Sequence, residues 1–260
     1  MRLALCQLEI SWEDKEKSRE QAVYWIRKAG KDRADLILLP EMSLTGFSMN
    51  VEKTGEKDEN TIIFMKEQAL CYHISIGFGW VKKIKDNMPA ENHYTVIDRM
   101  GQIISDYQKI HPFRYGKETE YFSSGDQLSF FRIKDFICST FLCYDLRFPE
   151  VFQAVSGTAD MILVPANWPE LRREHWLCLL KARAIENQVY IAGVNCVGEI
   201  GGINYSGDSM VIDPDGNVLD VLSYEEGLVI CDIINNVEQI REEFPVREDR
   251  KRELYRRWLS

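Results

Sequence analysis

The feature that most constrains the fold is an alternation of short apolar runs with longer, charged, periodic segments. The apolar runs that indicate buried strands lie at residues 3–10, 34–39, 73–81, 128–133, 136–143, 161–166, 189–197 and 228–233. Segments with helical periodicity lie at residues 14–29, 60–72, 147–156, 172–187 and 237–243. Such alternation is typical of an α/β or α+β protein whose helices cover a sheet. Pairs of strands linked as hairpins, at residues 93–109 and 209–222, predict a mixed sheet.

Length and composition indicate one globular domain. The chain has 260 residues, of which 45% are hydrophobic and 28% charged, close to the averages of globular proteins. No linker, repeat or low-complexity run divides it, so we expect a single domain over residues 1–260. The tail, from about residue 245 to residue 260, is too polar and basic to form a core of its own. It is expected to pack on a partner subunit or to fray.

Charge and cysteine content exclude several classes of function. The net charge of −9 lacks the basic footprint of a nucleic-acid binder. The apolar runs are far shorter than a membrane span, so no membrane partner is expected. The seven cysteines show no CxxC spacing and the four histidines no HExxH motif, so no metal site is predicted. The odd cysteine count, with no signal peptide recognised, indicates a reducing, cytoplasmic location.

Three polar residues stand where apolar strands end. Glu41 follows Leu39-Pro40, Lys109 ends the strand that contains Tyr107, and Cys143 follows Phe141-Leu142 just before a predicted helix. Strand ends of this kind line the crevices of α/β proteins. A helix N-terminus lowers the pKa of a thiol and offers N–H groups to an oxyanion, which makes Cys143 a candidate nucleophile. Each residue alone is equally compatible with a structural role.

Together the three residues form a workable catalytic set. Glu41 could take the thiol proton of Cys143, and Lys109 could stabilise the thiolate and the developing oxyanion. The backbone N–H of Tyr144 could complete the oxyanion hole. A cysteine–histidine dyad with His111 or His175 remains a rival arrangement.

The order of these motifs resembles the nitrilase superfamily of carbon–nitrogen hydrolases. The resemblance rests on Leu39-Pro40-Glu41, on Lys109 in Tyr-Gln-Lys-Ile-His, and on Cys143 in Leu-Cys-Tyr-Asp-Leu-Arg-Phe-Pro-Glu, and it covers essentially the whole chain. It implies a four-layer α-β-β-α sandwich with mixed sheets, with Glu41, Lys109 and Cys143 catalytic and no metal or organic cofactor. It also implies a second glutamate between Lys109 and Cys143. The turn that ends at Asp126 points to Glu118, with Glu120 as a competitor.

Further segments resemble one branch, the bacterial ω-amidases. These are the run from Leu39 to Phe47, Ala166-Asn167-Trp168-Pro169, the helix around residues 175–188, Tyr205-Ser-Gly-Asp-Ser209 and the late Arg-Glu-Glu-Phe-Pro run. The resemblance implies hydrolysis of the side-chain amide of 2-oxoglutaramate or 2-oxosuccinamate to the keto dicarboxylate and ammonia, through a cysteine thioester. The alternatives are an N-carbamoyl amino acid hydrolase, an aliphatic amidase, an inactive scaffold or a redox-sensing thiol protein. The superfamily also implies a homodimer.

The substrate implied by the resemblance carries a distal carboxylate, which needs a cation. Arg172 follows the Ala-Asn-Trp-Pro run and is our candidate for bidentate pairing with that carboxylate, unless it only begins a solvated helix. Trp168 and Phe47 could wall the pocket or pack in the core. Arg147 is expected to pair with Glu150 or to cross a dimer interface.

Overall fold

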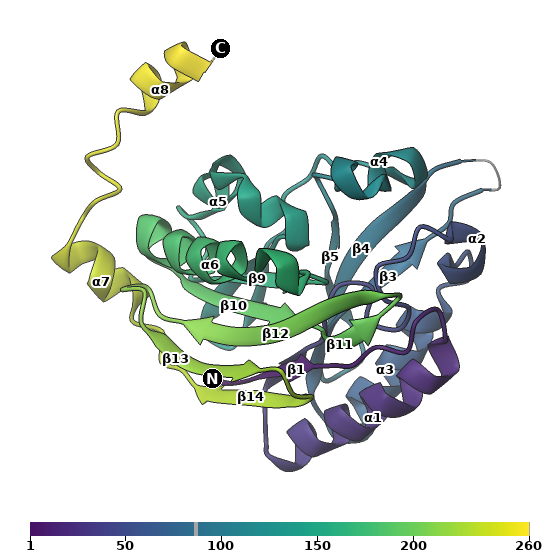
Figure 1. Ribbon diagram of the computed structural model, residues 1–260. Coiled ribbons are helices and arrows are strands. Elements are labelled where there is room, and N and C mark those ends of the chain that lie inside the picture. Colours follow the sequence, from purple (N-terminus) through teal and green to yellow (C-terminus); the bar gives the residue numbers. More distant parts are fainter. Residues whose placement is uncertain (86–87, 260) are drawn as a thin grey trace.

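The computed structural model describes residues 1–85 and 88–259. Figure 1 shows two sheets with helices on both outer sides. The strands are β1 (Arg2–Gln7), β2 (Leu36–Leu38), β3 (Ser75–Lys82), β4 (Ala90–Ile97), β5 (Ile103–Gln108), β6 (Phe122–Ser123), β7 (Phe131–Ile133), β8 (Phe136–Thr140), β9 (Met161–Ala166), β10 (Tyr190–Asn195), β11 (Val197–Ile200), β12 (Ile203–Ile212), β13 (Val218–Ser223) and β14 (Gly227–Asp232).

The helices are of two kinds. The α-helices are α1 (Lys15–Lys31), α2 (Val51–Thr54), α3 (Asn60–Tyr72), α4 (Glu118–Tyr121), α5 (Pro149–Val155), α6 (Arg173–Asn187), α7 (Val237–Glu243) and α8 (Arg252–Leu259). The short 3₁₀ helices are η1 (Arg114–Gly116), η2 (Cys143–Arg147) and η3 (Glu170–Arg172). Within the described ranges, every helix falls short of the length and apolarity needed to cross a bilayer.

Both sheets are mixed. The first sheet has the order β14-β1-β2-β3-β4-β5, with β6 paired to β4. In it β1, β2 and β3 run parallel, while β4 is antiparallel to β3 and β5. The second sheet has the order β11-β12-β10-β9-β8-β7, with β13 paired to β12. In it β8, β9 and β10 run parallel and the other neighbours are antiparallel.

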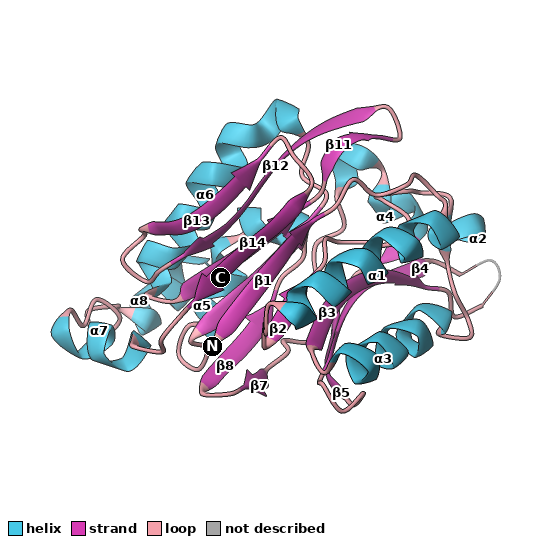
Figure 2. Ribbon diagram, turned by 90° about the horizontal axis from the view of Figure 1, so that it is seen from below, coloured by secondary structure: helices cyan, strands magenta, loops and turns pink. Residues whose placement is uncertain are grey.

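Side-chain alternation along the strands builds the layers. In β1, Leu3 and Leu5 face the second sheet, whereas Ala4 and Cys6 pack with the apolar faces of α1 and α3. This period-two pattern is that of a strand buried on both sides. On the other side of the molecule α5 and α6 cover the second sheet (Figure 2). The predicted α-β-β-α sandwich with mixed sheets is therefore confirmed.

Several element boundaries differ from the sequence prediction. The helix predicted over residues 147–156 is split into η2 and α5, because Pro149 lacks the N–H that a continuous helix would need. Residues 197–200 and 203–212 form a hairpin, whereas the prediction placed no strand over residues 198–208. The tail contains a helix, α8, which lies apart from the body in Figure 1.

Candidate active site

The loop after β2 buries Glu41 completely. Gly79 of β3 makes this possible, since a Cβ there would lie 2.3 Å from the backbone N of Met42. The hydroxyl of Ser43 fixes the loop by donating to Pro40 O at 2.5 Å and accepting from Gly79 N at 2.8 Å. The sequence thus places a carboxylate in the interior and locks its backbone from both sides.

Lys109 and Glu118 meet Glu41 in one buried cluster. Lys109 Nζ lies 2.8 Å from Glu41 Oε1 and 2.9 Å from Glu118 Oε2. Asn92 Nδ2 donates to the same two carboxylates, at 2.9 and 3.0 Å. We call these four residues the inner cluster. Of the two glutamates considered from the sequence, Glu118 lies here, whereas Glu120 is exposed.

Burial and charge compete in the inner cluster. Burial alone would lower the pKa of Lys109, but the charges of Glu118 and Glu41 outweigh it and raise that pKa above its usual value. Burial also raises the pKa of Glu118, and Lys109 only partly offsets this. Two carboxylates thus share one ammonium group in a dry setting, where a proton is easily moved between partners.

Cys143 stands at the start of η2 in a left-handed conformation, with φ of 45°. A non-glycine residue held there carries backbone strain, which surrounding contacts must fix. Asp145 supplies them by accepting hydrogen bonds from Leu142 N at 2.9 Å and from the Tyr107 hydroxyl at 2.8 Å. The thiol of Cys143 faces Asn167 O at 3.8 Å.

The expected lowering of the Cys143 pKa is wrong. Burial, and then the negative charge of Glu41, raise the pKa of the Cys143 thiol well above its usual value, against the opposing charge of Lys109. The short η2 helix does not overcome these two effects. At rest the Cys143 side chain is therefore a thiol, which would need a base beside it to act as a nucleophile.

The histidine dyad receives no support from the geometry. His111 Nδ1 contacts Asp145 Oδ1 at 2.7 Å, and His175 Nδ1 contacts Arg147 at 3.3 Å. Across residues 1–85 and 88–259, neither ring forms a hydrogen bond with the thiol of Cys143. The group that acts on the thiol is instead the carboxylate of Glu41. Its charge and a hydrogen bond with it both raise the pKa of the Cys143 thiol.

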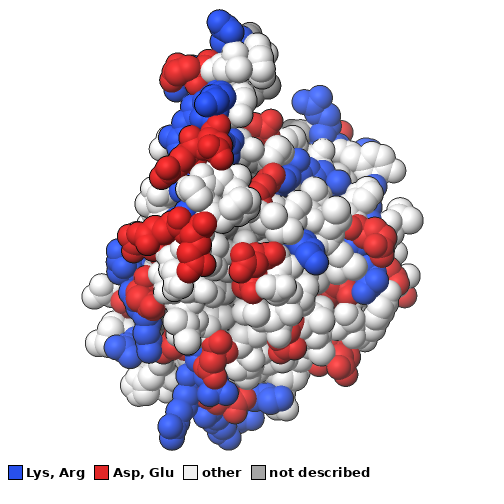
Figure 3. All heavy atoms as spheres, turned by 90° about the vertical axis from the view of Figure 1, so that its left-hand side faces the viewer, with Lys and Arg blue, Asp and Glu red and all other residues white. Residues whose placement is uncertain are grey.

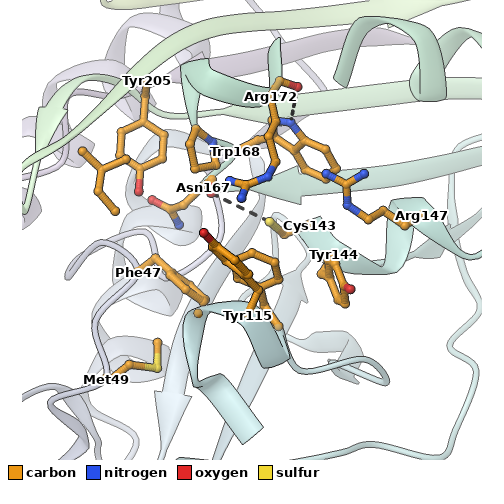
Figure 4. A pocket seen from close by; sticks show the side chains of 14 residues that line it. Phe47, Met49, Tyr115, Cys143, Tyr144, Arg147, Asn167, Trp168, Arg172 and Tyr205 are labelled. Carbon is orange, nitrogen blue, oxygen red and sulfur yellow. Dashed lines mark hydrogen bonds between the residues drawn. The ribbon is translucent and has the colours of Figure 1, made fainter. Parts of the chain in front are cut away.

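A pocket of about 270 Å³ opens onto Cys143. Phe47, Trp168 and Arg172, which the sequence suggested, all line it, as does Tyr144. Figure 4 shows Cys143 near the centre, with Arg172 on one side and Phe47 below. The Arg172 guanidinium lies 5.1 Å from the ring centre of Tyr115 and 5.8 Å from that of Phe113. Such stacking fixes the cation while leaving its N–H donors free for a ligand.

The expected pairing of Arg147 with Glu150 is wrong. In the described residues Arg147 instead lines the pocket, with its guanidinium 4.6 Å from the centre of the Trp168 ring. Its alternative place at a dimer interface stays a prediction. Its pKa is lowered by burial and by the neighbouring charge of Arg172. Two guanidiniums therefore stand at one end of the pocket, which we call the cationic end.

Sequence reasoning also missed two asparagines that hold Glu41. Asn92 does so through its side chain, and Asn167 donates from its backbone N to Glu41 Oε2 at 3.1 Å and from Nδ2 to Glu41 O at 2.5 Å. A polar residue at an inward position of a buried strand was the available signal for Asn92. In the described residues, no group of three or more histidine, cysteine or acidic side chains is placed to hold a metal ion.

Comparison with known proteins places this geometry in a family. The family model described as carbon-nitrogen hydrolase matches residues 2–242. The chain is 33% identical to a 2-oxoglutaramate amidase of Bacillus subtilis, over 97% of this chain and 98% of that protein. It is 35% identical to a "hydrolase in agr operon" of Staphylococcus aureus, over 98% and 100%.

A solved structure agrees over the whole fold. An amidase from Nesterenkonia, seen after Michael addition of acrylamide at its active site cysteine, matches with a TM-score of 0.87 at 25% identity, over 99% of both chains. The nitrilase-superfamily resemblance inferred from the motifs is thereby confirmed. The chain belongs to the carbon–nitrogen hydrolase family and is a hydrolase of amides with a cysteine nucleophile.

Proposed function

We propose that the protein is an ω-amidase that cleaves the side-chain amide of 2-oxoglutaramate or 2-oxosuccinamate, with Cys143 as nucleophile and no metal or organic cofactor. The observation that carries the proposal is one pocket lined by Cys143 and two guanidiniums, with the inner cluster buried behind it. Glu41 of that cluster accepts a hydrogen bond from the backbone N of Asn167, which lines the pocket. The 2-oxoglutaramate amidase of Bacillus subtilis, similar over nearly the whole chain, supports the substrate class.

In the first half-reaction, Glu41 takes the proton of the Cys143 thiol as sulfur attacks the amide carbon. The carbonyl oxygen gains negative charge, which Lys109 Nζ and the backbone N–H of Tyr144 stabilise. The N–H of Tyr144 suits this role because the first N–H groups of a helix lack partners within it. Protonated Glu41 then donates to the departing nitrogen, and ammonia leaves a thioester on Cys143.

In the second half-reaction, a water molecule takes the place of ammonia. Glu41 removes a proton from it, and the hydroxide attacks the thioester at the same oxyanion site. The keto dicarboxylate leaves, and the thiol regains its proton. Glu118 keeps Lys109 charged and in place, since its carboxylate lies within 3.1 Å of Nζ through both oxygens. Because Glu118 touches the ammonium rather than the acyl carbon, its contribution is to charge and position.

The cationic end selects the substrate. Neither Arg147 nor Arg172 has a carboxylate partner among residues 1–85 and 88–259. Paired N–H donors suit the planar carboxylate of a keto acid, and the pocket that both arginines line together with Cys143 would hold its carbon chain. The aromatic rings of Trp168 and Phe47 would line the part of the pocket that holds the carbon chain of the substrate. The Trp168 ring also packs against the Arg147 guanidinium.

A substrate panel tests the proposal. Ammonia release is measured from 2-oxoglutaramate, glutamine, an N-carbamoyl amino acid, a simple aliphatic amide and a nitrile. We expect turnover of the keto acid amide at a kcat/KM at least tenfold above the others. Turnover confined to the carbamoyl compound would make the protein a carbamoylase, and equal turnover of neutral aliphatic amides would remove the role of the cationic end.

We also propose that the protein is a homodimer, as the superfamily resemblance implies. The support is the tail: α8 lies apart from the body, and Trp258 is 66% exposed. Figure 3 shows acidic and basic side chains interspersed on this face and along the tail, which favours pairing of complementary charges. Light scattering after size exclusion should give twice the chain mass, and deletion of residues 247–260 should shift it toward the monomer.

A further inference from the structure

The side-chain oxygen of Asn167 is a buried acceptor without a partner. Asn167 is 3% exposed, and its Nδ2 donates to Glu41 O. Because a carbonyl oxygen can only accept, the amide must turn its nitrogen toward Glu41 and its oxygen away. In the described part of the chain, Oδ1 then finds no donor. A buried oxygen left this way is costly unless a ligand supplies the missing N–H or O–H.

The hydroxyl of Tyr205 is a second polar group in the same pocket. Tyr205 lines the pocket and is 4% exposed, and no hydrogen bond of its hydroxyl is found within residues 1–85 and 88–259. Burial, then the charges of the Cys196, Cys143 and Glu41 side chains, raise the pKa of Tyr205, so the phenol stays neutral. A neutral phenol oxygen can accept a hydrogen bond as well as donate one.

These two groups lie across Cys143 from Arg147. In Figure 4, Tyr205 stands on the side of the pocket opposite Arg147, and Asn167 lies between Tyr205 and Cys143. We call Asn167 and Tyr205 the neutral end. The pocket is thus cationic on one side of the nucleophile and uncharged but hydrogen-bonding on the other.

The planar geometry of an amide indicates which of its atoms faces the neutral end. A planar amide carbon has three substituents, and the mechanism proposed above places its oxygen at Lys109 and Tyr144. If the carboxylate-bearing chain extends to the cationic end, the nitrogen must point to the remaining side. Glu41, which protonates that nitrogen, is joined to Asn167 by two hydrogen bonds and so stands on the correct side.

We propose that Asn167 Oδ1 and the Tyr205 hydroxyl accept the two N–H groups of the substrate's NH₂, and that this makes the enzyme specific for primary amides. The inference rests on the proposed amide hydrolysis. An ester of the same acid presents an oxygen with no hydrogen, so Asn167 Oδ1 stays unsatisfied and the Tyr205 hydroxyl accepts no N–H. A site of this kind discriminates strongly between amide and ester, because a buried polar group that loses its hydrogen-bond partner costs free energy. Amides with a substituted nitrogen lose one donor and bring added bulk against the tyrosine ring.

The test is the ratio of amide to ester hydrolysis. 2-Oxoglutaramate and the 5-methyl ester of 2-oxoglutarate give the same thioester, so their kcat/KM values differ only in binding and acylation. Tyr205→Phe removes the hydroxyl and keeps the ring that packs in the core. We expect kcat/KM for the amide to fall about tenfold and that for the ester to change less than twofold. Equal losses for both substrates, or no loss for the amide, would overturn the proposal.

A matched variant controls for the loss of a tyrosine hydroxyl elsewhere. Tyr190 donates to Ile234 O at 2.9 Å, away from the pocket, so Tyr190→Phe should leave the amide-to-ester ratio unchanged. If the wild-type protein does not hydrolyse 2-oxoglutaramate, the substrate proposal fails by itself. The ratio is then taken with propionamide and methyl propionate, where the same drop for Tyr205→Phe supports the neutral end and an unchanged ratio refutes it.

Discussion

Two ionic clusters lie on opposite faces of β4, one residue apart in the sequence. On the inner face Asn92 joins Glu41, Lys109 and Glu118. On the outer face His93 Nδ1 contacts Asp106 at 2.9 Å and its Nε2 contacts Glu91 at 2.9 Å. We call His93, Glu91 and Asp106 the outer cluster. Both clusters place a cation between two carboxylates, yet only the inner one adjoins a nucleophile and a pocket.

The difference shows which features distinguish the cluster that we propose to be catalytic from one that only holds the sheet together. In the outer cluster Asp106 also accepts from Thr95, whose hydroxyl accepts from Trp80, so each group has its partner within the sheet. In and beside the inner cluster, Asn92 Oδ1 and Asn167 Oδ1 have no partner in the described residues. Both clusters contain buried ion pairs, so ion pairing and burial do not indicate a functional site by themselves. The informative features are a neighbouring pocket and polar atoms without a hydrogen-bond partner.

The largest expected effect separates Cys143 from the other buried cysteines. Cys143→Ala should lower kcat by about 10⁴-fold or more, since removal of a nucleophile that acts in concert with a base abolishes covalent catalysis. Cys138, fully buried in β8 five residues before Cys143, is the matched control. Cys138→Ala should retain activity within threefold and lose about 1–2 kcal/mol of stability. Retained activity in Cys143→Ala would show that Cys143 does not differ in function from the other buried cysteines.

Glu118→Gln and His93→Gln should produce opposite phenotypes. Glu118→Gln should reduce kcat about 10²–10³-fold with a small change in Tm, because one carboxylate still pairs with Lys109. His93→Gln should leave kcat within threefold and lower the free energy of unfolding by about 1–2 kcal/mol, because Asp106 is partly exposed and solvent screens the pair. Kinetics and thermal unfolding on both variants check this, and equal activity losses would erase the distinction between the clusters.

The cationic end should affect binding more than chemistry. Arg172→Ala and Arg147→Ala should each raise KM for 2-oxoglutaramate about tenfold and change that for a neutral aliphatic amide less than threefold. Steady-state kinetics on both substrates measure the ratio. If KM for the keto acid amide is unchanged in Arg172→Ala, the carboxylate does not bind that arginine.

The smallest effect is a pH dependence of stability from the outer cluster. Burial opposes the imidazolium of His93, but Asp106 and Glu91 outweigh it and raise its pKa above the unfolded value of about 6.5. The stabilisation is thus fully present below about pH 6.5 and is lost as pH rises through the folded pKa. The pKa of Asp106 is lowered despite burial, so its contribution is lost only in acid.

Unfolding in urea at several pH values measures this dependence. The difference in stability between wild type and His93→Gln should be largest near pH 5–6 and shrink toward pH 9. A difference that grows with pH would mean that His93 is buried as the neutral ring.

The sequence was most informative where polar residues interrupt apolar strands. Glu41, Lys109 and Cys143 stand at such points, and the order of their motifs led to the family and the layered fold. Glu118 was reached only through the resemblance, since residues 117–120 alone do not tell which of Glu118 and Glu120 turns inward. The placement of Glu118 depends on its contacts with Lys109 and Asn92, which the local sequence pattern does not encode.

Other parts could not be predicted, for physical reasons. Arg147 lies three residues from Glu150, which suggested a local ion pair, but the turn at Pro149 directs the arginine to Trp168 instead. The pKa of Cys143 was misjudged because the short η2 helix competes with burial and with Glu41. Tyr205 entered the sequence analysis only as part of a segment that resembles the ω-amidases, and only the structure shows that it lines the pocket.

The most direct test of the central claim is to trap the acyl-enzyme. Wild-type protein is mixed with 2-oxoglutaramate, quenched in acid within a turnover, and examined by intact mass and peptide mapping, with Cys143→Ala in parallel. The account predicts a thioester-linked 2-oxoglutaryl group on Cys143 and none on the variant. Turnover of the amide with the acyl group on another residue, or undiminished turnover by Cys143→Ala, would contradict it.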